Sequence, residues 1–323
     1  MEMSDTQKIS LFLQSGEYGG EAPSLKEGTV VGDWRVVAFL SKGCNGEVYR
    51  VCNQYVDFYC ALKICHCKAS DAQRLRFKRE ASVLAGLDGV AFPRFLGCGE
   101  YKGRLFIVME YLYPLDLPNG EMRVAKFAYK LCGALSFMHR KGLVHRDVKP
   151  ANIMRRQDGE LVLIDYGLVL PRHEEKESLA DRVSFVDSGL EVVGTPGYSA
   201  PEQFTGGVVD FSCDVHAVGV LINRCFNGRP PFYWRRIIER ATSSISARRF
   251  STIGQLALAI RFRHWQSVSL LLISAGVLGC VLWRALSMGE ENGNLSVPLD
   301  DDRKVNGDSP PGYSAGDSVG EWL

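Results

Sequence analysis

The ten residues from His145 to Met154 constrain this 323-residue chain more than any other stretch of its sequence. They place a carboxylate (Asp147), an ammonium group (Lys149) and an amide (Asn152) at fixed spacing, with a proline following the lysine. Phosphoryl transfer needs an oriented acceptor hydroxyl, cations that offset the phosphate charge, and a held Mg²⁺ ion. Each of the three side chains suits one of these tasks. The alternative interpretation is a charged surface turn, which the motifs elsewhere in the chain disfavour.

The run resembles the catalytic loop H-R-D-x-x-x-x-N of eukaryotic-type protein kinases. The resemblance implies an α+β fold with two lobes, a small antiparallel β lobe and a larger, mainly helical lobe. It also implies roles for the three side chains. Asp147 would orient the acceptor hydroxyl and accept its proton, Lys149 would offset charge on the transferred group, and Asn152 would bind Mg²⁺ or Mn²⁺.

A glycine-containing hairpin is predicted between two β-rich segments near residue 45. The segment 41–48 aligns with the kinase loop G-x-G-x-x-G-x-V, with Ser41 at the position of the first glycine. Glycine at positions 43 and 46 lets backbone N–H groups approach the nucleotide phosphates without a Cβ in the way. Taken alone, the segment could equally be an ordinary hairpin. The resemblance implies that ATP contacts Ser41, Gly43, Gly46 and Val48.

A lysine on the next predicted strand resembles the V-A-I-K element of kinases, whose lysine reaches the α- and β-phosphates. Lys63 follows Ala61 and Leu62, and Ala61 is expected to contact the nucleotide as well. The predicted helix 71–87 supplies the glutamate partner, for which Glu80 fits the family's R-E-x-x-x-L pattern. The alternative for Glu80 is an exposed acidic residue in a helix rich in arginine and lysine.

The apolar run 104–112 predicts a buried strand that leads into the hinge between the lobes. By resemblance, Met109 would be the gatekeeper residue, and Glu110 and Leu112 would present backbone groups to adenine. A core strand without a nucleotide role is the alternative, and the two interpretations are compatible.

An aspartate at the end of the apolar strand 161–164 can place a hard oxygen ligand for Mg²⁺ at the edge of a cleft. Asp165-Tyr166-Gly167 resembles the D-F-G motif, with tyrosine in place of phenylalanine. If Tyr166 is buried, its hydroxyl needs a polar partner. Asp165 is therefore predicted to be a metal ligand, while the packing of Tyr166 is left open.

The segment 194–202 matches the end of a kinase activation segment, which closes with A-P-E. Glu202 is expected to pair with Arg248 or Arg249. Thr195 together with Lys149 favours Ser/Thr over Tyr acceptors and is predicted to belong to the catalytic group. The closing helices follow Pro230-Pro231-Phe232 almost at once, so there is little room for the helix that often docks protein substrates.

Phosphorylation of the polar segment before residue 194 is a further expectation. Arg146 lies beside the catalytic aspartate, and a phosphate can order a loop by pairing with arginine. Ser184 and Ser188 are the candidate acceptors, and autophosphorylation would involve self-association of the chain.

Composition excludes several other classes of protein. The 38 Lys and Arg balance 37 Asp and Glu, so no basic field favours nucleic acid as a partner. Ten cysteines lack the spacing of a disulfide framework. Cys65-His66-Cys67 hints at a metal, but a zinc site needs four ligands, so a structural role on a strand is favoured.

The stretch from Trp265 to Trp283 carries no formal charge and predicts a transmembrane helix. Arginines concentrate before it, which places the preceding domain in the cytoplasm and the tail on the other side. A buried C-terminal helix is the alternative. The expected organisation is a flexible leader over 1–28, a kinase domain over 29–263 (small lobe and hinge 29–112, large lobe 113–263), a single transmembrane helix over 265–284 and a short disordered tail over 285–323.

Together these motifs predict an ATP-dependent, membrane-anchored Ser/Thr protein kinase of the bacterial Hanks-type branch, with Ser and Thr residues of proteins as substrates. Two alternatives remain open at this point. A pseudokinase scaffold would keep the fold without turnover, and Ser41 and Tyr166 are the two motif departures in its favour. A small-molecule kinase would share the ATP-binding residues but usually lacks the motif at 194–202.

Overall fold

A computed structural model describes residues 23–43, 45–55, 58–171, 194–205, 208–262 and 276–284 of the chain. The chain divides into two units, Met1–Val268 and Ser269–Leu323, which are described separately.

The small lobe of the first unit is built on an antiparallel sheet with the strand order β1-β2-β3-β4-β6-β5. Strands β2 and β3 form the long hairpin predicted around residue 45, and Gly46 closes it at a φ of +151°. A Cβ at Gly46 would collide with the carbonyl of Ile64 on the next strand, so glycine is required there. The strands are β1 (Val30–Val31), β2 (Trp34–Gly43), β3 (Gly46–Asn53), β4 (Tyr59–Ile64), β5 (Phe95–Tyr101) and β6 (Arg104–Glu110).

Helix α2 (Asp71–Ala85) accompanies this sheet and starts at a capping box. The Ser70 hydroxyl accepts the Gln73 N–H at 3.3 Å, and the Gln73 side chain accepts the Ser70 N–H at 2.9 Å, which satisfies two backbone donors at the helix start. Phe77 and Leu84 are buried, and so is Glu80 on the same helix. Since a glutamate is rarely buried without a partner, the burial of Glu80 already marks a paired charge.

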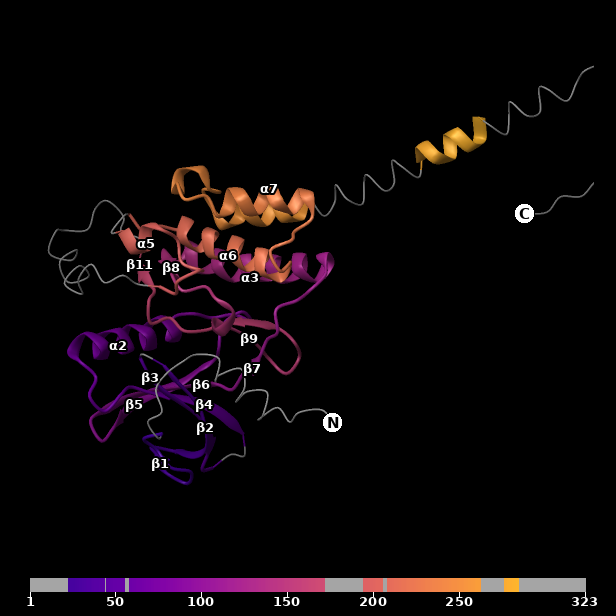
Figure 1. Cartoon of the computed structure of the whole chain (residues 1–323). Coiled ribbons are helices and arrows are strands. Elements are labelled where there is room, and N and C mark those ends of the chain that lie inside the picture. The colour runs from indigo at the N-terminus through magenta and orange to yellow at the C-terminus, as the bar shows by residue number, and fades with distance from the viewer. Residues whose placement is uncertain are drawn as a thin grey trace, which may run out of the picture. The chain divides into compact units, whose positions relative to one another are not determined.

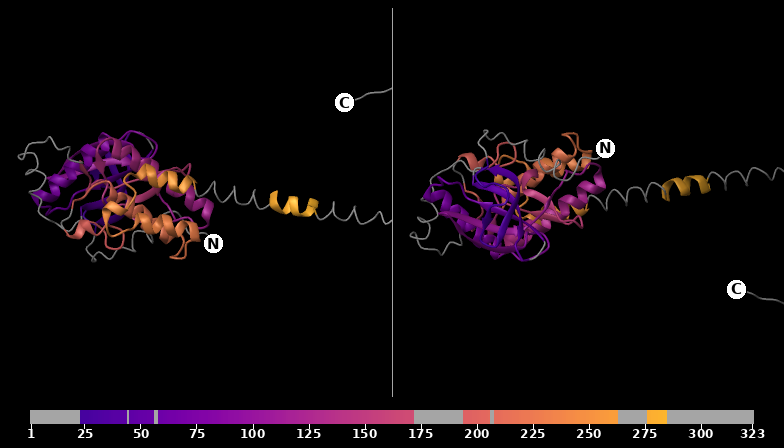
Figure 2. Two further views of the ribbon diagram at one scale, coloured as in Figure 1. Left: turned by 90° about the horizontal axis from the view of Figure 1, so that it is seen from above. Right: turned by 90° about the horizontal axis from the view of Figure 1, so that it is seen from below.

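The large lobe is mainly helical, as the sequence predicts. Its apolar stripes at helical spacing, for example Val124, Leu131 and Leu135 on α3, are fully buried. Figure 1 shows its helices at the opposite end from the sheet, and in the two views of Figure 2 the orange helices lie next to magenta α3. The helices are α3 (Glu121–Arg140), α5 (Glu202–Thr205), α6 (Ser212–Cys225), α7 (Phe232–Ala241) and residues 253–262.

Short strand pairs between the lobes carry the catalytic loop. The loop starts after β8 and passes through a 3-10 turn, Pro150–Asn152, directly into β9. Strand β10 pairs with β9 and ends two residues before Asp165. Strand β11 pairs with β8, and a three-stranded sheet has the order β10-β9-β7. The strands are β7 (Tyr113–Pro114), β8 (Leu143–Val144), β9 (Ile153–Arg155), β10 (Leu161–Leu163) and β11 (Leu170–Pro171).

Two apolar cores support the lobes. One is formed by the helices of the large lobe and extends to Phe77 and Leu84 of α2, and the other lies within the small-lobe sheet. Leu25 belongs to the small-lobe core and is buried. The part of the predicted leader that the structure describes, residues 23–28, is therefore packed against the small lobe at this residue.

In the second unit, residues 276–284 are helical and exposed. Most of the predicted span, residues 265–275, lies outside the described residues. Among the helices that the structure does describe, none combines the length and the apolar character needed to cross a membrane.

Candidate active site

Asp147 lies at the centre of the catalytic loop, and its carboxylate contacts three side chains. The Thr195 hydroxyl donates to Oδ1 at 2.7 Å, and the Asn152 amide donates to Oδ2 at 3.0 Å. The Lys149 ammonium lies 2.7 Å from Oδ2 and also donates to the Thr195 hydroxyl at 2.9 Å. The structure thus brings three predicted residues, Thr195, Asn152 and Lys149, together around the Asp147 carboxylate, and the Thr195 hydroxyl is hydrogen-bonded to it.

A buried carboxylate on helix α6 holds the backbone of this loop. Asp214 is fully buried and accepts the N–H groups of His145 and Arg146, each at 2.9 Å. His139 of α3 contacts the same carboxylate at 2.8 Å. Arg146 has a φ of +69°, a conformation that costs energy for a residue with a side chain. The two hydrogen bonds that the backbone donates to Asp214 stabilise this conformation and so fix the neighbouring Asp147.

Lys63, Glu80 and Asp165 form a second charged cluster. The Lys63 ammonium lies 2.5 and 2.7 Å from the two Glu80 oxygens and 3.1 Å from Asp165 Oδ1. The ion pair predicted between Lys63 and Glu80 is therefore present, and strand β4 and helix α2 position it. Asp165 reaches the cluster from the end of β10 with a φ of +65°.

Burial and charge act in opposite directions on the pKa values of this cluster. Burial alone would lower the pKa of Lys63, but the carboxylates of Asp165 and Glu80 outweigh it and raise that pKa. Burial raises the pKa of Glu80 to about 7, although the Lys63 ammonium opposes the shift. For Asp165, burial is outweighed by Lys63, and its pKa is lowered. Asp165 is therefore an anion at neutral pH, the form in which a carboxyl group binds a metal.

Asn152 and Asp165 fit the predicted divalent ion by the chemistry of their donors. The Asn152 nitrogen is used by the Asp147 carbonyl at 2.8 Å and by its carboxylate, so the amide oxygen is the atom available to a metal. Mg²⁺ prefers carboxylate and carbonyl oxygens of this kind. Among the described residues no group of three His, Cys, Asp or Glu forms a metal site, and Cys65-His66-Cys67 is no exception.

The hairpin of β2 and β3 carries the four predicted phosphate-loop residues. Ser41 pairs with Val48 and Gly43 pairs with Gly46 across the hairpin, and Val48 pairs with Lys63 on its other side. At the tip, the Asn45 amide lies so close to Gly167 that a Cβ there would be 2.7 Å from it. A side chain at Gly167, the last residue of the D-F-G-like motif, would therefore require the Asn45 side chain to move.

Glu47, directly after the phosphate-loop glycine, is a buried charge that the sequence did not single out. Its carboxylate accepts the hydroxyls of Tyr49 at 2.8 Å and of Ser24, and the Arg104 guanidinium lies 3.3 Å away. Arg104 also donates to the Ser24 hydroxyl at 2.6 Å. These contacts tie residues 24 and 25 to the base of the loop. The contacts of Glu47 with Ser24 and Arg104 join residues that are far apart in the sequence, so no local pattern predicts them.

At the hinge, Glu110 is held by an arginine of the large lobe. Arg156, which follows β9, donates to the two Glu110 oxygens at 2.7 and 2.9 Å and to the Phe92 carbonyl at 2.8 Å. Glu110 ends strand β6 opposite Cys60, and Leu112 is buried two residues later. Ala61 pairs with Met109 next to it. Ala61 and Glu110 therefore lie on adjacent strands at one end of the sheet, and Leu112 lies in the segment that follows β6.

Tyr166 is buried, and its hydroxyl donates to the Leu163 carbonyl. Burial raises the pKa of this hydroxyl well above its ordinary value, so it remains a donor at neutral pH. The polar partner that the extra hydroxyl requires is thus a backbone carbonyl three residues earlier in the chain.

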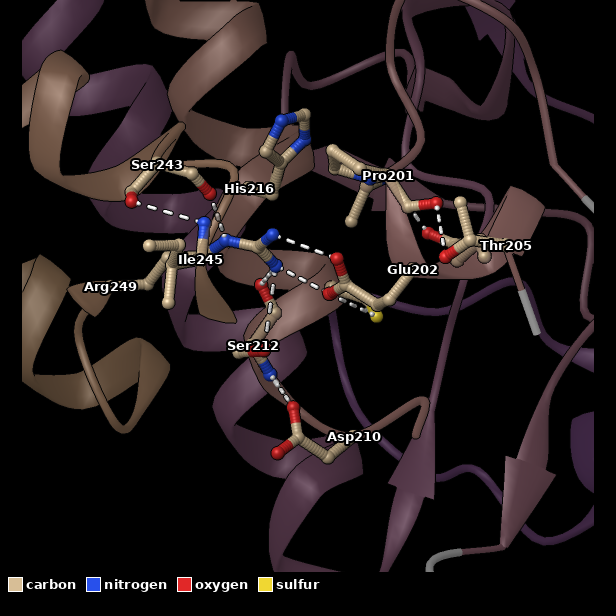
Figure 3. A network of polar contacts seen from close by, with 12 residues as sticks. Pro201, Glu202, Thr205, Asp210, Ser212, His216, Ser243, Ile245 and Arg249 are labelled. Carbon is tan, nitrogen blue, oxygen red and sulfur yellow. Dashed lines mark hydrogen bonds and ion pairs between the residues drawn. The ribbon is translucent and has the colours of Figure 1, made fainter. Parts of the chain in front are cut away.

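The end of the activation segment is fixed by a buried ion pair. Glu202 binds Arg249 through two contacts, at 2.5 and 2.8 Å, and Arg249 also donates to the carbonyls of Ser212 at 3.1 Å and Ser243 at 2.7 Å. Figure 3 shows this network, with His216 beside the pair. Of the two arginines expected to pair with Glu202, the partner is Arg249. Ser184 and Ser188 lie outside the described residues.

Comparisons with known proteins identify the family. A family model described as protein kinase domain matches residues 34–275, which is more than half of the chain. The chain belongs to the protein kinase family. Serine/threonine-protein kinase pkn3 of Myxococcus xanthus is 34% identical over 233 residues, covering 68% of this kinase and 42% of pkn3. The DNA damage-responsive serine/threonine-protein kinase RqkA of Deinococcus radiodurans is 33% identical over 64% of this chain and 32% of its own.

Solved structures agree with this family membership. The PknI kinase domain of Mycobacterium tuberculosis superposes with a TM-score of 0.57 at 26% identity, covering 74% of this kinase and 99% of that domain. The predicted bilobal fold is confirmed, as is the resemblance to Hanks-type Ser/Thr protein kinases. This kinase spans less than half the length of these two curated relatives.

Proposed function

We propose that this protein is an ATP-dependent Ser/Thr protein kinase that transfers the γ-phosphate of ATP to hydroxyl groups of protein substrates. The observation that carries the proposal is the Thr195 hydroxyl, which lies 2.7 Å from Asp147 Oδ1 and 2.9 Å from Lys149. A substrate hydroxyl needs the same two groups: a carboxylate that orients it and accepts its proton, and a cation near the transferred phosphoryl group.

Each residue of the site has one task in this reaction. Lys63, held by Glu80, orients the α- and β-phosphates of ATP, and the hinge residues bind adenine. Asp165 and Asn152 would hold the Mg²⁺ or Mn²⁺ ion, which when bound offsets charge on the phosphate oxygens. Asp147 accepts the proton of the acceptor hydroxyl while Lys149 offsets charge on the group in transfer.

A phosphate-transfer assay with the full chain tests the proposal. The chain is incubated with radiolabelled Mg-ATP and a generic basic protein, beside Asp147→Asn and, as a control, Asp116→Asn, which removes an exposed carboxylate outside the catalytic loop. We expect transfer by the wild type and the control and its loss in Asp147→Asn. Wild-type transfer no greater than that of Asp147→Asn would refute the kinase proposal and favour a pseudokinase.

We also propose that the chain is anchored in a membrane through 265–284, with the kinase domain in the cytoplasm. The support is in the sequence: no charge from Trp265 to Trp283, a length of roughly 28 Å as a helix, and arginines before the stretch. The test is fractionation after a carbonate wash, together with a reporter fused after Leu323. Release by carbonate, or a reporter active only in the cytoplasm, would contradict the anchored arrangement.

Autophosphorylation through self-association is the third part of the proposal, with Ser184 and Ser188 as acceptors. Transfer between two copies predicts that the initial specific rate rises with protein concentration, whereas transfer within one copy does not depend on it. Mass mapping that finds phosphate on neither serine after incubation with ATP would exclude these two acceptors.

A further inference from the structure

The segment around Thr195 places a tyrosine close to the acceptor position. The N–H groups of Tyr198 and Ser199 both donate to the Thr195 carbonyl at 3.1 Å, so residues 195–199 form one tight turn. Thr195 itself contacts Asp147. Tyr198 is therefore one turn away from Thr195, whose hydroxyl occupies the position on Asp147 that a substrate hydroxyl would take; we call this the acceptor position.

An exposed arginine covers this tyrosine. Arg224, near the end of α6, has its guanidinium carbon 4.2 Å from the centroid of the Tyr198 ring. Its Nη2 atom would lie 3.7 Å from a Cβ on Gly197. The arginine thus lies against the segment 197–198 and remains open to solvent.

The charge of Arg224 is not cancelled by the neighbouring glutamate of the segment. Glu202 is committed to Arg249 at 2.5 and 2.8 Å. A second cation acts on the same tyrosine: burial raises the pKa of Tyr198, while Arg224 and Lys149 oppose the shift. In the geometry, Arg224 lies over the Tyr198 ring and Lys149 donates to the Thr195 hydroxyl at 2.9 Å, so both cations belong to the segment 195–198. A guanidinium group carries five N–H donors in a planar fork, which match a carboxylate in bidentate geometry.

We propose that Arg224 is a specificity residue, and that this kinase prefers protein substrates with an acidic side chain within three residues of the acceptor Ser or Thr. The limit of three residues has two reasons. Only one tight turn separates Thr195 from Tyr198. An extended peptide advances about 3.3 Å per residue, so a side chain that reaches Arg224 is expected close to the acceptor residue in the substrate sequence. This inference rests on the proposed kinase activity and names the substrate class that the same site selects.

A peptide scan tests the preference. A neutral peptide with one serine carries a single Asp or a single Lys at each of the three positions on either side, and kcat and KM are measured with the full chain. We expect that at one position at least kcat/KM for the Asp peptide exceeds that for the Lys peptide about tenfold, through KM, because a rim charge acts on binding. Added salt should reduce this ratio, since the arginine is exposed.

Three variants separate selection by charge from support of Tyr198. Arg224→Glu should reverse the Asp/Lys ratio at the preferred position, and Arg224→Gln should bring it close to one. Arg240→Glu is the matched control, because Arg240 is also exposed and stacks on Phe250 at 4.3 Å. It should keep the wild-type ratio. Thermal unfolding of each variant shows whether it folds. If Arg224→Glu does not fold, the neutral variant Arg224→Gln provides the comparison with the wild type.

The outcomes distinguish this inference from the proposed function. A wild-type chain that phosphorylates the peptides without preferring Asp at any position overturns the role of Arg224 and leaves the kinase proposal standing. The role is overturned as well if Arg224→Glu lowers kcat/KM for Asp and Lys peptides alike, because the arginine would then only support Tyr198. A wild type that phosphorylates neither peptide nor protein refutes the proposed function itself.

Discussion

The Lys63 ammonium contacts two carboxylates, and its contacts with Glu80 are shorter than its contact with Asp165. Glu80 contacts it through both oxygens on one side, while Asp165 contacts it through one oxygen at 3.1 Å. Because Glu80 is the more buried carboxylate, its charge costs more to maintain, which is why burial raises its pKa to about 7. The residue that holds the lysine therefore titrates near neutral pH, and the two carboxylates differ in function as well as in position.

Glu80 should therefore give the proposed kinase an acidic limit to its activity. As pH falls through about 7, Glu80 takes up a proton and loses its charge contact with Lys63. We expect wild-type kcat/KM to fall as pH is lowered from 8 to 6. Glu80→Gln should be about 100-fold less active at pH 8, because Lys63 is then misplaced. Its kcat/KM should not show the decrease between pH 8 and 6.

Glu160→Gln is the matched control for that pH profile, because Glu160 pairs with Lys130 at the surface at 2.8 Å. Steady-state kinetics of the three proteins across the pH range provide the measurement. A falling acidic limb that persists in Glu80→Gln would assign the titration to another group.

Tyr166→Phe tests the tyrosine in the D-F-G-like motif. The substitution removes the hydroxyl that donates to the buried Leu163 carbonyl, so we expect a loss of about 1 kcal/mol of unfolding free energy and a decrease of roughly 2–4 °C in Tm. Tyr129→Phe on α3, whose side chain is exposed, should leave Tm unchanged. Equal Tm values for the two variants would mean that the hydrogen bond contributes nothing.

Among the elements, α5 and α6 depend on a residue outside both of them. Arg249 has no exposed side-chain surface and joins Glu202 of α5 to the Ser212 carbonyl at the start of α6. It follows the 3-10 turn Ser246–Arg248, whose geometry brings it to this position. One arginine therefore fixes the start of both helices, and with them the segment that carries Thr195.

Arg249→Ala should consequently be far more destabilising than the same change at its neighbour. Removing one partner leaves Glu202 without its cation, which typically costs about 3–5 kcal/mol for a buried pair. Arg248→Ala changes an exposed side chain and should stay within about 0.5 kcal/mol of the wild type. Urea unfolding provides the comparison. Similar midpoints for the two variants would rule out an anchoring role for Arg249.

The elements also show what the sequence can and cannot predict. The β-rich segments and the glycines predicted the hairpin around residue 45, and the resemblance to kinase motifs implied the catalytic loop and the pairing of Lys63 with Glu80. The partners of Glu47 and Glu110 were not predictable, because Arg104 and Arg156 reach them from 57 and 46 residues away. The sequence likewise left Arg248 and Arg249 equivalent, and the 3-10 turn Ser246–Arg248 leaves Arg248 exposed and Arg249 buried.

In the whole folded domain, the helices of the large lobe meet the catalytic loop at Asp214. This carboxylate lies on α6, receives His139 from α3 and accepts two N–H groups of the loop. Burial would raise its pKa, but the hydrogen bond and charge of His139 outweigh it, and the pKa lies below its ordinary value of 3.8. Its ionised form therefore stabilises the fold as a whole.

Asp214 should make stability depend on acidity. A carboxyl group whose pKa is lowered by folding contributes its full stabilisation above the unfolded value and loses it as pH falls through the folded value. We expect the unfolding free energy to decrease below about pH 4 in the wild type, and less steeply in Asp214→Asn, which should also be less stable at pH 7. Urea midpoints between pH 3 and 7 measure both effects.

Asp88→Asn, which alters an exposed carboxyl group, is the control for the acid series. It should reproduce the wild-type curve. An acid dependence of Asp214→Asn as steep as that of the wild type would attribute the loss to other carboxyl groups, such as Glu202, whose pKa is also lowered because its hydrogen bonds to Arg249 outweigh burial.

The contact between Arg156 and Glu110 restricts the movement of the two lobes relative to each other. Arg156 belongs to the large lobe, yet it binds the last residue of β6 and the carbonyls of Val90 and Phe92 before β5. A rotation that opens the two lobes must either carry this guanidinium along with the small lobe or break charge-assisted hydrogen bonds. If the protein has the proposed kinase activity, the rate at which ADP is released would then depend on an arginine outside the residues that we assign to ATP and substrate binding.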